Sequence, residues 1–365
     1  MNILIQLSHP AHFHLYKNVA RNLMNDGNRV YILIKTKDIL EDLLKQSGLP
    51  YYNILKNAHR KSKLGVILDM FVREVKMIRF VYKHKIDLLT GSTPEVAHVS
   101  LLARKYGLNT GEDDIKVIPA FAKMVYPFAD TILSPVSCDN GKCEKKTIKY
   151  ASYHELAYLH PNNFVAQKEI ARKYVDIDRP YFILRFAKLN AHHDDGIHGI
   201  NTAIAQRLLD VLLPHGNVYI TAERELEPQF EKYRIHIKTI VMHHVMAYAD
   251  MYVGDSQTMA EEAAMLGVPF VRFNGFVGRI GCLEELEQNG YKLGYGVKPE
   301  NEALLYSAVN EILSTPNRYE VYQKRRQKLL ADKIDYAAFL TWFIENYPES
   351  REIMKINPDY QYRFR

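Results

Sequence analysis

The sequence predicts an α/β protein with two halves, each a parallel β-sheet covered by helices. Three observations lead to this fold class. Short apolar runs alternate with helix-like segments in the first half, the alternation fades at residues 135–161, and it then starts again. Such alternation is typical of parallel βαβ units with helices on both faces of a sheet. The chain has 365 residues, a length at which two domains are more usual than one.

The first half begins with an apolar strand and continues as strand–helix pairs. We expect strands at residues 2–7, 29–34, 51–55, 87–90 and 131–133. We expect helices at residues 15–25, 38–47, 64–84 and 95–106. Gly27, Gly48 and Gly107 follow three of these helices, as glycines do where a helix ends in the left-handed conformation. A further short strand can precede Gly111.

The second half repeats the pattern after a junction near residues 165–180. We expect strands at residues 181–186, 218–221, 251–253 and 270–273, and helices at residues 200–213, 257–266 and 300–314. The segment 319–347 is charged and helical. The predicted domains are residues 1–170 and 171–346, followed by a polar tail at 347–365. Two such halves are expected to form a cleft at the carboxyl ends of their strands.

The composition is that of an ordinary globular enzyme, with 47% hydrophobic and 25% charged residues. The N-terminus lacks the features of a signal peptide, and no apolar run is long enough to span a bilayer, so we expect a cytoplasmic protein. The net charge of +6 suits an anionic ligand or a membrane surface and is too small for a nucleic-acid-binding protein. Three cysteines, at 138, 143 and 282, predict neither a disulfide framework nor a zinc site.

The most informative segment is residues 254–269, where an apolar strand runs into a polar turn that begins a helix. The turn contains Asp255, Ser256, Gln257 and Thr258. Backbone N–H groups at the start of a helix are unpaired and its dipole favours anions, so this turn can hold a phosphate. Glu262 lies about one and a half turns further along, where its carboxylate can accept hydrogen bonds from two ribose hydroxyls. The combination suggests a nucleotide, and the plain alternative is a helix capped by Asp255 or Ser256.

Three histidines, His9, His12 and His14, lie in a predicted loop after the first strand. The ordinary pKa of histidine suits general-base catalysis near neutral pH. We therefore favour a functional role for the cluster. The alternative is that one or two of them cap the next helix or bind loop carbonyls.

Two further groups of polar residues follow predicted strands. Arg185 and Lys188 come at the end of a strand in the second half, where they can clamp a diphosphate. The loop at residues 192–198 after them contains histidines and aspartates, but their spacing fits no metal-ligand pattern, so we expect no metal and leave this loop unassigned. Glu112 and Asp113 follow the short strand before Gly111, where one can orient a histidine or contact an acceptor hydroxyl; the alternative is a turn that caps a helix.

Residues 60–85 mix basic and apolar side chains. This mixture is compatible with contact to an anionic membrane surface. A helix with one face in the core and a solvated basic face explains it equally simply, and we favour that interpretation.

With both halves in view, the chain resembles a two-domain GT-B protein. More narrowly, it resembles a prokaryotic family of uncharacterised GT-B-like proteins, a domain of unknown function. The matching residues are His-Pro-Ala-His at 9–12, Gly-Asp-Ser-Gln-Thr-Met at 254–259, Glu-Ala at 262–263 and Leu-Gly-Val-Pro at 266–269. MurG-type glycosyltransferases and UDP-N-acetylglucosamine 2-epimerase share this pattern. The resemblance implies two Rossmann-like domains facing a central cleft, an acceptor side followed by a nucleotide-sugar-binding side, and C-terminal helices.

The resemblance also implies roles for single residues. Ser256 and Thr258 fall at the diphosphate and Glu262 at the ribose. The MurG histidine after the first strand falls on His12, which makes His12 the expected general base. Arg185 would offset charge that develops on the leaving diphosphate.

The implied activity is that of a metal-independent glycosyltransferase that uses a nucleotide-diphosphate sugar, with a UDP-sugar favoured. Its acceptor would be a hydroxyl group, lipid-linked or not, in cell-surface polysaccharide or glycolipid synthesis. Departures from the shared pattern bear on the implied activity. Gln257 and Thr258 stand where the relatives carry glycine, and Ser92 stands where the epimerase carries an aspartate. The acid expected shortly after Pro119 is also absent. An epimerase or hydrolase therefore ranks second, and a non-catalytic nucleotide-sugar-binding protein is the third alternative.

Overall fold

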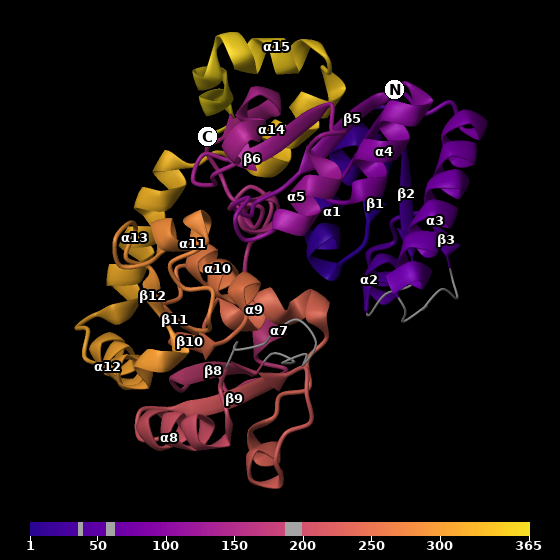
Figure 1. The fold of residues 1–365 in the computed structure, drawn as a ribbon. Coiled ribbons are helices and arrows are strands. Elements are labelled where there is room, and N and C mark those ends of the chain that lie inside the picture. Colours follow the sequence, from indigo (N-terminus) through magenta and orange to yellow (C-terminus); the bar gives the residue numbers. More distant parts are fainter. Residues whose placement is uncertain (36–38, 56–62, 187–198) are drawn as a thin grey trace. The chain divides into compact units, whose positions relative to one another are not determined.

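The computed structural model describes residues 1–35, 39–55, 63–186 and 199–365. It confirms the predicted fold class, since the chain forms two parallel sheets covered by helices (Figure 1). Unit 1 consists of Met1–Asn163 and Lys333–Arg365, and unit 2 is Phe164–Asp332. These limits differ from the predicted domain boundaries after residues 170 and 346, because the C-terminal helices pack with the first half of the chain.

Unit 1 contains a seven-stranded parallel sheet in the order β3-β2-β1-β4-β5-β6-β7. Its strands are β1 (Asn2–Leu7), β2 (Arg29–Lys35), β3 (Tyr51–Leu55), β4 (Leu88–Gly91), β5 (Tyr106–Thr110), β6 (Thr131–Pro135) and β7 (Thr147–Tyr150). Its helices are α1 (Pro10–Asn25), α2 (Leu40–Ser47), α3 (Lys63–Lys83), α4 (Pro94–Ala103), α5 (Pro119–Val125), α6 (Leu156–Leu159), α14 (Tyr336–Glu345) and α15 (Glu349–Ile356), with 3₁₀ turns at Gly141–Lys146 and Pro358–Phe364. The order from β3 to β6 is that of a Rossmann fold, which reverses direction between β1 and β4.

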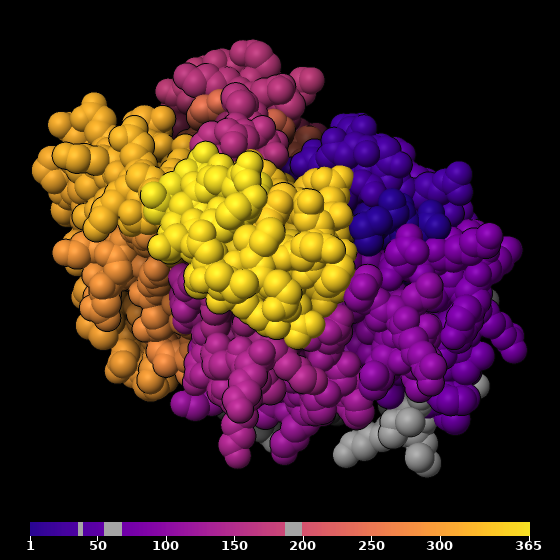
Figure 2. All heavy atoms as spheres, turned by 90° about the horizontal axis from the view of Figure 1, so that it is seen from above, coloured from indigo at the N-terminus to yellow at the C-terminus, as the bar shows by residue number. Residues whose placement is uncertain are grey.

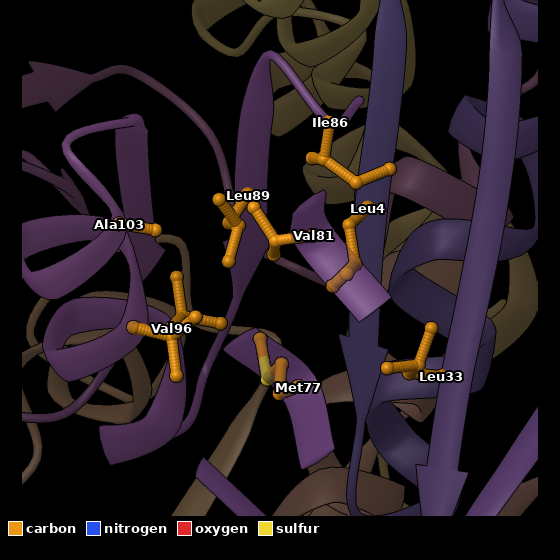
Figure 3. Packing of buried hydrophobic residues seen from close by; sticks show 9 residues of the cluster. Leu4, Leu33, Met77, Val81, Ile86, Leu89, Val96 and Ala103 are labelled. Atoms are coloured by element: carbon orange, nitrogen blue, oxygen red, sulfur yellow. The ribbon is translucent and has the colours of Figure 1, made fainter. Parts of the chain in front are cut away.

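Apolar side chains from the sheet and two helices form the core on one face of unit 1. Figure 3 shows how these side chains, all buried, converge. They are Leu4, Leu33, Ile86 and Leu89 from the sheet region, Met77 and Val81 from α3, and Val96, Val99 and Ala103 from α4. One face of α3 is therefore buried in the core.

The predictions for residues 95–107 are wrong in detail. The helix expected at residues 95–106 ends at Ala103, because Arg104 adopts a left-handed conformation with φ 54° and the chain then enters β5. Gly107 accordingly does not follow a helix as predicted. It lies inside β5, where a Cβ atom would collide with the Ser100 side chain of α4, so glycine is required there by close packing.

The C-terminal segment predicted as a tail is folded. It forms α15 and the 3₁₀ turn at Pro358–Phe364, in which Ser350, Met354 and Gln361 are buried. Gln361 accepts a hydrogen bond from the backbone N–H of Ala151 at 2.6 Å. Figure 2 shows the C-terminal part of the chain (yellow) as a continuous area of the molecular surface.

Unit 2 contains a five-stranded parallel sheet in the order β12-β11-β10-β8-β9. Its strands are β8 (Tyr181–Phe186), β9 (Asn217–Ala222), β10 (Met251–Gly254), β11 (Phe270–Phe273) and β12 (Gly294–Val297). Its helices are α7 (Lys168–Ala171), α8 (Thr202–Leu212), α9 (Met242–Met246), α10 (Gln257–Leu266), α11 (Gly281–Leu286), α12 (Glu302–Leu313) and α13 (Arg318–Asp332), with 3₁₀ turns at Pro228–Tyr233, Thr239–Val241 and Pro299–Asn301. The sheet order reverses direction between β8 and β10, and the crevice at such a point is where doubly wound sheets bind ligands.

The four strands predicted in the second half are confirmed. Strand β12 was not predicted, because two glycines interrupt its apolar pattern. Gly294 is needed there, since a Cβ atom at this position would lie 2.5 Å from the ring of Phe270. In the described part of the chain, no helix has the length and hydropathy needed to cross a membrane.

Candidate functional site

The turn between β10 and α10 lies at the point where the sheet of unit 2 reverses direction. The strand ends at Gly254, and α10 begins at Gln257 as predicted. Ser256 is the N-cap, since its Oγ accepts a hydrogen bond from the Met259 N–H at 3.4 Å. The N-terminus of α10, at the carboxyl edge of the sheet, is partly exposed, and helix geometry there favours an anion.

Close packing holds this turn against β8. A Cβ atom on Gly254 would lie 2.7 Å from the Cβ of Arg185 and 2.5 Å from the hydroxyl of Tyr252, so only glycine fits. The buried Tyr252 hydroxyl donates to the backbone oxygen of Ser256 at 3.2 Å. Burial raises the pKa of Tyr252 well above its ordinary value, so the hydroxyl stays a donor.

A buried polar network supports the same turn from β11. Asn274 Nδ2 donates to the backbone oxygen of Asp255 at 3.2 Å. Arg272 is fully buried, donates to Asn274 Oδ1 at 3.4 Å and pairs with Glu287 at 2.7 Å. Burial raises the pKa of Glu287 to about 7, although Arg272 acts in the opposite direction. This network was not predicted from the sequence; the signal that could have revealed it is the arginine inside the apolar strand Phe270–Phe273.

Glu262, the residue predicted to bind ribose, lies inside α10 and is only 6% exposed. Its Oε1 is 2.8 Å from Nε2 of His243, a residue of α9 that is 4% exposed. The sequence analysis did not single out His243. Its nineteen-residue separation from Glu262 corresponds to no local motif, so only the fold could reveal the pair.

Arg185 lies near the carboxyl end of β8, beside the β10–α10 turn. Its backbone oxygen accepts a hydrogen bond from the Asp255 N–H at 3.4 Å, and its guanidinium pairs with Glu223, which follows β9. The structure therefore brings Arg185 together with the predicted phosphate-binding turn. Lys188 and the loop at residues 192–198 lie outside the described residues.

The three histidines after β1 occupy three different environments, and the predicted loop is largely helical. Helix α1 begins at Pro10 rather than near residue 15, because proline suits the first helical position and His9 caps the helix. Nδ1 of His9 accepts from the Ala11 N–H at 3.2 Å. His12 lies half-buried in the first turn, with Nδ1 3.4 Å from the Ser8 N–H nitrogen. His14 is buried, with its ring 5.1 Å from that of Tyr158.

Hydroxyl groups line the point where the sheet of unit 1 reverses direction, between β1 and β4. The Tyr16 hydroxyl lies 2.7 Å from Thr90 Oγ1 and 3.2 Å from Thr110 Oγ1. Ser92 Oγ lies 2.7 Å from Thr110 Oγ1, so a neutral network includes the serine that stands where the epimerase pattern has an aspartate. Burial raises the pKa of Tyr16 to about 12, which keeps this network uncharged.

Glu112 and Asp113 follow β5 at the same edge of the sheet. Glu112 Oε2 lies 3.1 Å from Nδ1 of His154, a histidine that comes from the segment after β7. Burial and the charge of Glu112 raise the pKa of Asp113 to about 6, against the opposing effect of His154. His154 was not predicted as a site residue, because it lies within residues 135–161, where the alternation of strands and helices fades.

Taken together, the described residues provide two polar strand-end clusters, one in each unit. The cluster of unit 2 combines a helix N-terminus, Arg185 and Glu262, which suits a phosphorylated ligand with hydroxyls. In unit 1, Glu112, Asp113 and His154 lie together, whereas His12 lies separately in the first turn of α1; side chains of these types suit proton transfer. Among the described residues, no three histidine, cysteine or acidic side chains come together as metal ligands.

A family model described as "Protein of unknown function (DUF354)" matches residues 1–335, and the chain belongs to this family. No curated protein matches the chain at a significant level.

Solved structures with the same fold include enzymes of two kinds. UDP-GlcNAc 2-epimerase from Neisseria meningitidis, bound to UDP-GlcNAc, is 12% identical with a TM-score of 0.67, over 95% of this chain and 100% of that one. Anabaena HepE, in complex with UDP and glucose, is 15% identical with a TM-score of 0.63, over 94% and 98%. The spinosyn forosaminyltransferase SpnP is 13% identical with a TM-score of 0.62, over 93% and 97%. At these identities the likeness establishes the fold, which is GT-B-like.

Proposed function

We propose that this protein is a metal-independent glycosyltransferase that takes a sugar from a nucleotide diphosphate, with a UDP-sugar as the favoured donor. The observation that carries the proposal is the β10–α10 turn, a partly exposed helix N-terminus at the reversal point of a doubly wound sheet. The same turn is flanked by Arg185 and followed by the carboxylate of Glu262. A helix N-terminus and a guanidinium suit a diphosphate, and a carboxylate suits a pair of ribose hydroxyls.

In this proposal unit 2 binds the donor. Ser256, Gln257 and Thr258 present the first N–H groups of α10 to the diphosphate, with Asp255 fixing the turn through Asn274. As the glycosidic bond breaks, negative charge grows on the leaving diphosphate. The helix N-terminus and Arg185 stabilise that charge, so the reaction needs no metal ion.

Unit 1 supplies the general base, His12, which removes the proton from an acceptor hydroxyl as it attacks the sugar. In the structure the Ser8 N–H donates a long hydrogen bond, at 3.4 Å, to Nδ1 of His12. Glu112 or Asp113 assists by binding the acceptor hydroxyl.

The proposed setting is cell-surface polysaccharide or glycolipid synthesis in the cytoplasm, with peripheral contact to the inner membrane face. Support for the membrane contact comes from α3, where Leu68 and Phe71 are 51% and 62% exposed. Exposed apolar side chains next to basic ones suit an anionic bilayer surface and a lipid-linked acceptor.

A nucleotide-sugar epimerase or hydrolase is the second candidate. It is favoured by one observation, the Glu112–His154 pair beside Asp113, whose raised pKa of about 6 suits acid–base chemistry on a sugar ring. The hydroxyl network around Ser92 argues against it, because that network supplies no charged group.

Incubation of the purified protein with a UDP-sugar, with and without a membrane lipid extract, separates these candidates. A transferase releases UDP mainly when an acceptor is present. An epimerase converts the sugar without an acceptor, and a hydrolase releases UDP without one. Retention of the donor with no chemical change under both conditions would contradict the proposal and leave a nucleotide-sugar-binding protein.

A further inference from the structure

His243 and Glu262 form a buried pair between α9 and α10. Their Nε2 and Oε1 atoms lie 2.8 Å apart, and both side chains keep less than a tenth of their surface exposed. A carboxylate that is removed from water needs a hydrogen-bond donor to offset its lost hydration. His243 provides such a donor, and it therefore helps to fix the orientation of the Glu262 carboxylate.

His243 is itself held in place by the first residues of unit 2. The ring of Phe164 lies edge-on to the His243 ring, with 6.1 Å between the ring centroids. The next residue, His244, packs on Phe164 at 4.9 Å and accepts a hydrogen bond from the Gln167 N–H at 3.1 Å through Nδ1. Helix α9 is thus anchored on one side to residues 164–167 and on the other to α10.

We propose that His243 is a positioning residue that orients Glu262 to recognise the 2′- and 3′-hydroxyls of a ribose. The ligand class is accordingly a ribonucleoside diphosphate rather than its 2′-deoxy counterpart. The inference rests on the proposed function, and specifically on the contact between Glu262 and the ribose. Beyond that contact, the inference identifies His243 as the group that aligns the Glu262 carboxylate. It also predicts that the protein selects a ribonucleotide over its 2′-deoxy counterpart.

Two physical effects produce this selectivity. A carboxylate already held by His243 loses little conformational freedom when a ribose binds, so more of the hydrogen-bond energy appears as affinity. A site built to bind a hydroxyl also rejects an analogue that lacks it, because the buried acceptor then loses its partner. Without His243, the carboxylate can rotate away, and both effects weaken.

The test compares the binding of UDP and 2′-deoxy-UDP to the full-length protein by isothermal titration calorimetry. The same ribo and deoxy pairs of GDP, CDP and ADP cover the other bases. The wild-type protein is expected to prefer the ribonucleotide. His243→Ala should weaken binding of the ribonucleotide roughly tenfold, as expected for a hydrogen bond to a charged group, and change binding of the deoxyribonucleotide by less than about twofold.

Two further variants distinguish a role of His243 in orienting Glu262 from a role in stabilising the fold. His243→Gln retains an amide donor of similar reach and should restore most of the preference. His244→Ala is the matched control, because His244 shares the contact with Phe164 but its Nδ1 bonds to Gln167. It should leave the ratio of the two affinities unchanged.

Three results would overturn the inference. If His243→Ala keeps the wild-type preference for the ribonucleotide, His243 does not position Glu262, while the proposed function stands. If His243→Ala weakens both nucleotides equally and His243→Gln does not restore them, the pair only stabilises the fold. If the wild-type protein binds none of the diphosphates, the proposed function itself fails and the inference fails with it.

Discussion

The buried acidic residues of this protein differ in which charged or polar groups lie next to their carboxylates. Glu262 and Glu287 each have a buried nitrogen donor within 3 Å, His243 and Arg272 respectively. For Asp113 the neighbouring group is instead another acid, Glu112, and together with burial it raises the pKa of Asp113 to about 6. A carboxyl group with this pKa exchanges a proton near neutral pH, which makes Asp113 the acid to examine first in unit 1.

The raised pKa of Asp113 predicts a specific pH dependence of stability. The folded state binds this proton more tightly than the unfolded chain, so the contribution of Asp113 to stability is present below about pH 4 and is lost as the pH rises through about 6. Asp113→Asn has no such proton and should become more stable relative to wild type over that range. Urea unfolding at several pH values measures the difference.

The control for this experiment is Glu169→Gln, which changes an exposed carboxylate and should leave the pH dependence as it is in wild type. A stability difference between Asp113→Asn and wild type that stays constant with pH would contradict the assignment.

The neighbouring histidines His9 and His12 predict separable effects. His12→Ala should lower sugar transfer at least a hundredfold, because a general base is lost, and leave UDP affinity intact. His9→Ala removes the cap of α1 and should cost about 1 kcal/mol of folding free energy while transfer is retained. Turnover, calorimetry and urea unfolding measure the three quantities, and full activity in His12→Ala would show that another group is the base.

At the scale of elements, a strong local pattern made prediction possible. The strand Tyr181–Phe186 and the helix Gln257–Leu266 have their predicted bounds, because an apolar run and a cap at Ser256 mark them. Strand β7 and the pairs His243–Glu262 and His154–Glu112 could not be predicted. The strand lies among turn residues, and each pair joins segments that only the fold brings together.

Helix α3 provides a test of the proposed membrane contact. Met77 and Val81 are buried in the core, whereas Phe71 is exposed and Arg73 is already paired with Glu95 at 2.6 Å. If α3 contacts lipid, Phe71→Ser should reduce co-sedimentation with vesicles that contain phosphatidylglycerol. Residues 60–62, at the basic start of this region, lie outside the described residues.

The matched control is Tyr319→Ser, which removes an aromatic side chain of unit 2 that is also exposed. It should leave co-sedimentation unchanged. A wild-type protein that does not sediment with these vesicles would exclude the membrane contact and leave α3 as a core helix with a solvated basic face.

For the whole molecule, the sequence predicted the class of fold and the family resemblance, and it did not predict which unit the C-terminal helices join. Asp335 shows why. Its carboxylate caps α14 and accepts hydrogen bonds from Asn162 and Asn163, more than 170 residues earlier in the chain. Such long-range bonds leave no periodic signal, so the helix at 336–345 could be predicted but its place in unit 1 could not.

The central claim is that unit 2 binds a nucleotide diphosphate through the N-terminus of α10 and Glu262. Thermal unfolding with UDP, GDP, CDP, ADP and their sugar conjugates tests it most directly, with Glu262→Ala measured in parallel. A ligand at about a hundred times its Kd should stabilise the wild-type protein by about 2.7 kcal/mol, and Glu262→Ala should lose much of this shift. Stabilisation by one nucleotide family that disappears in Glu262→Ala is the predicted result. No stabilisation by any of these ligands, or equal stabilisation of both proteins, would contradict it.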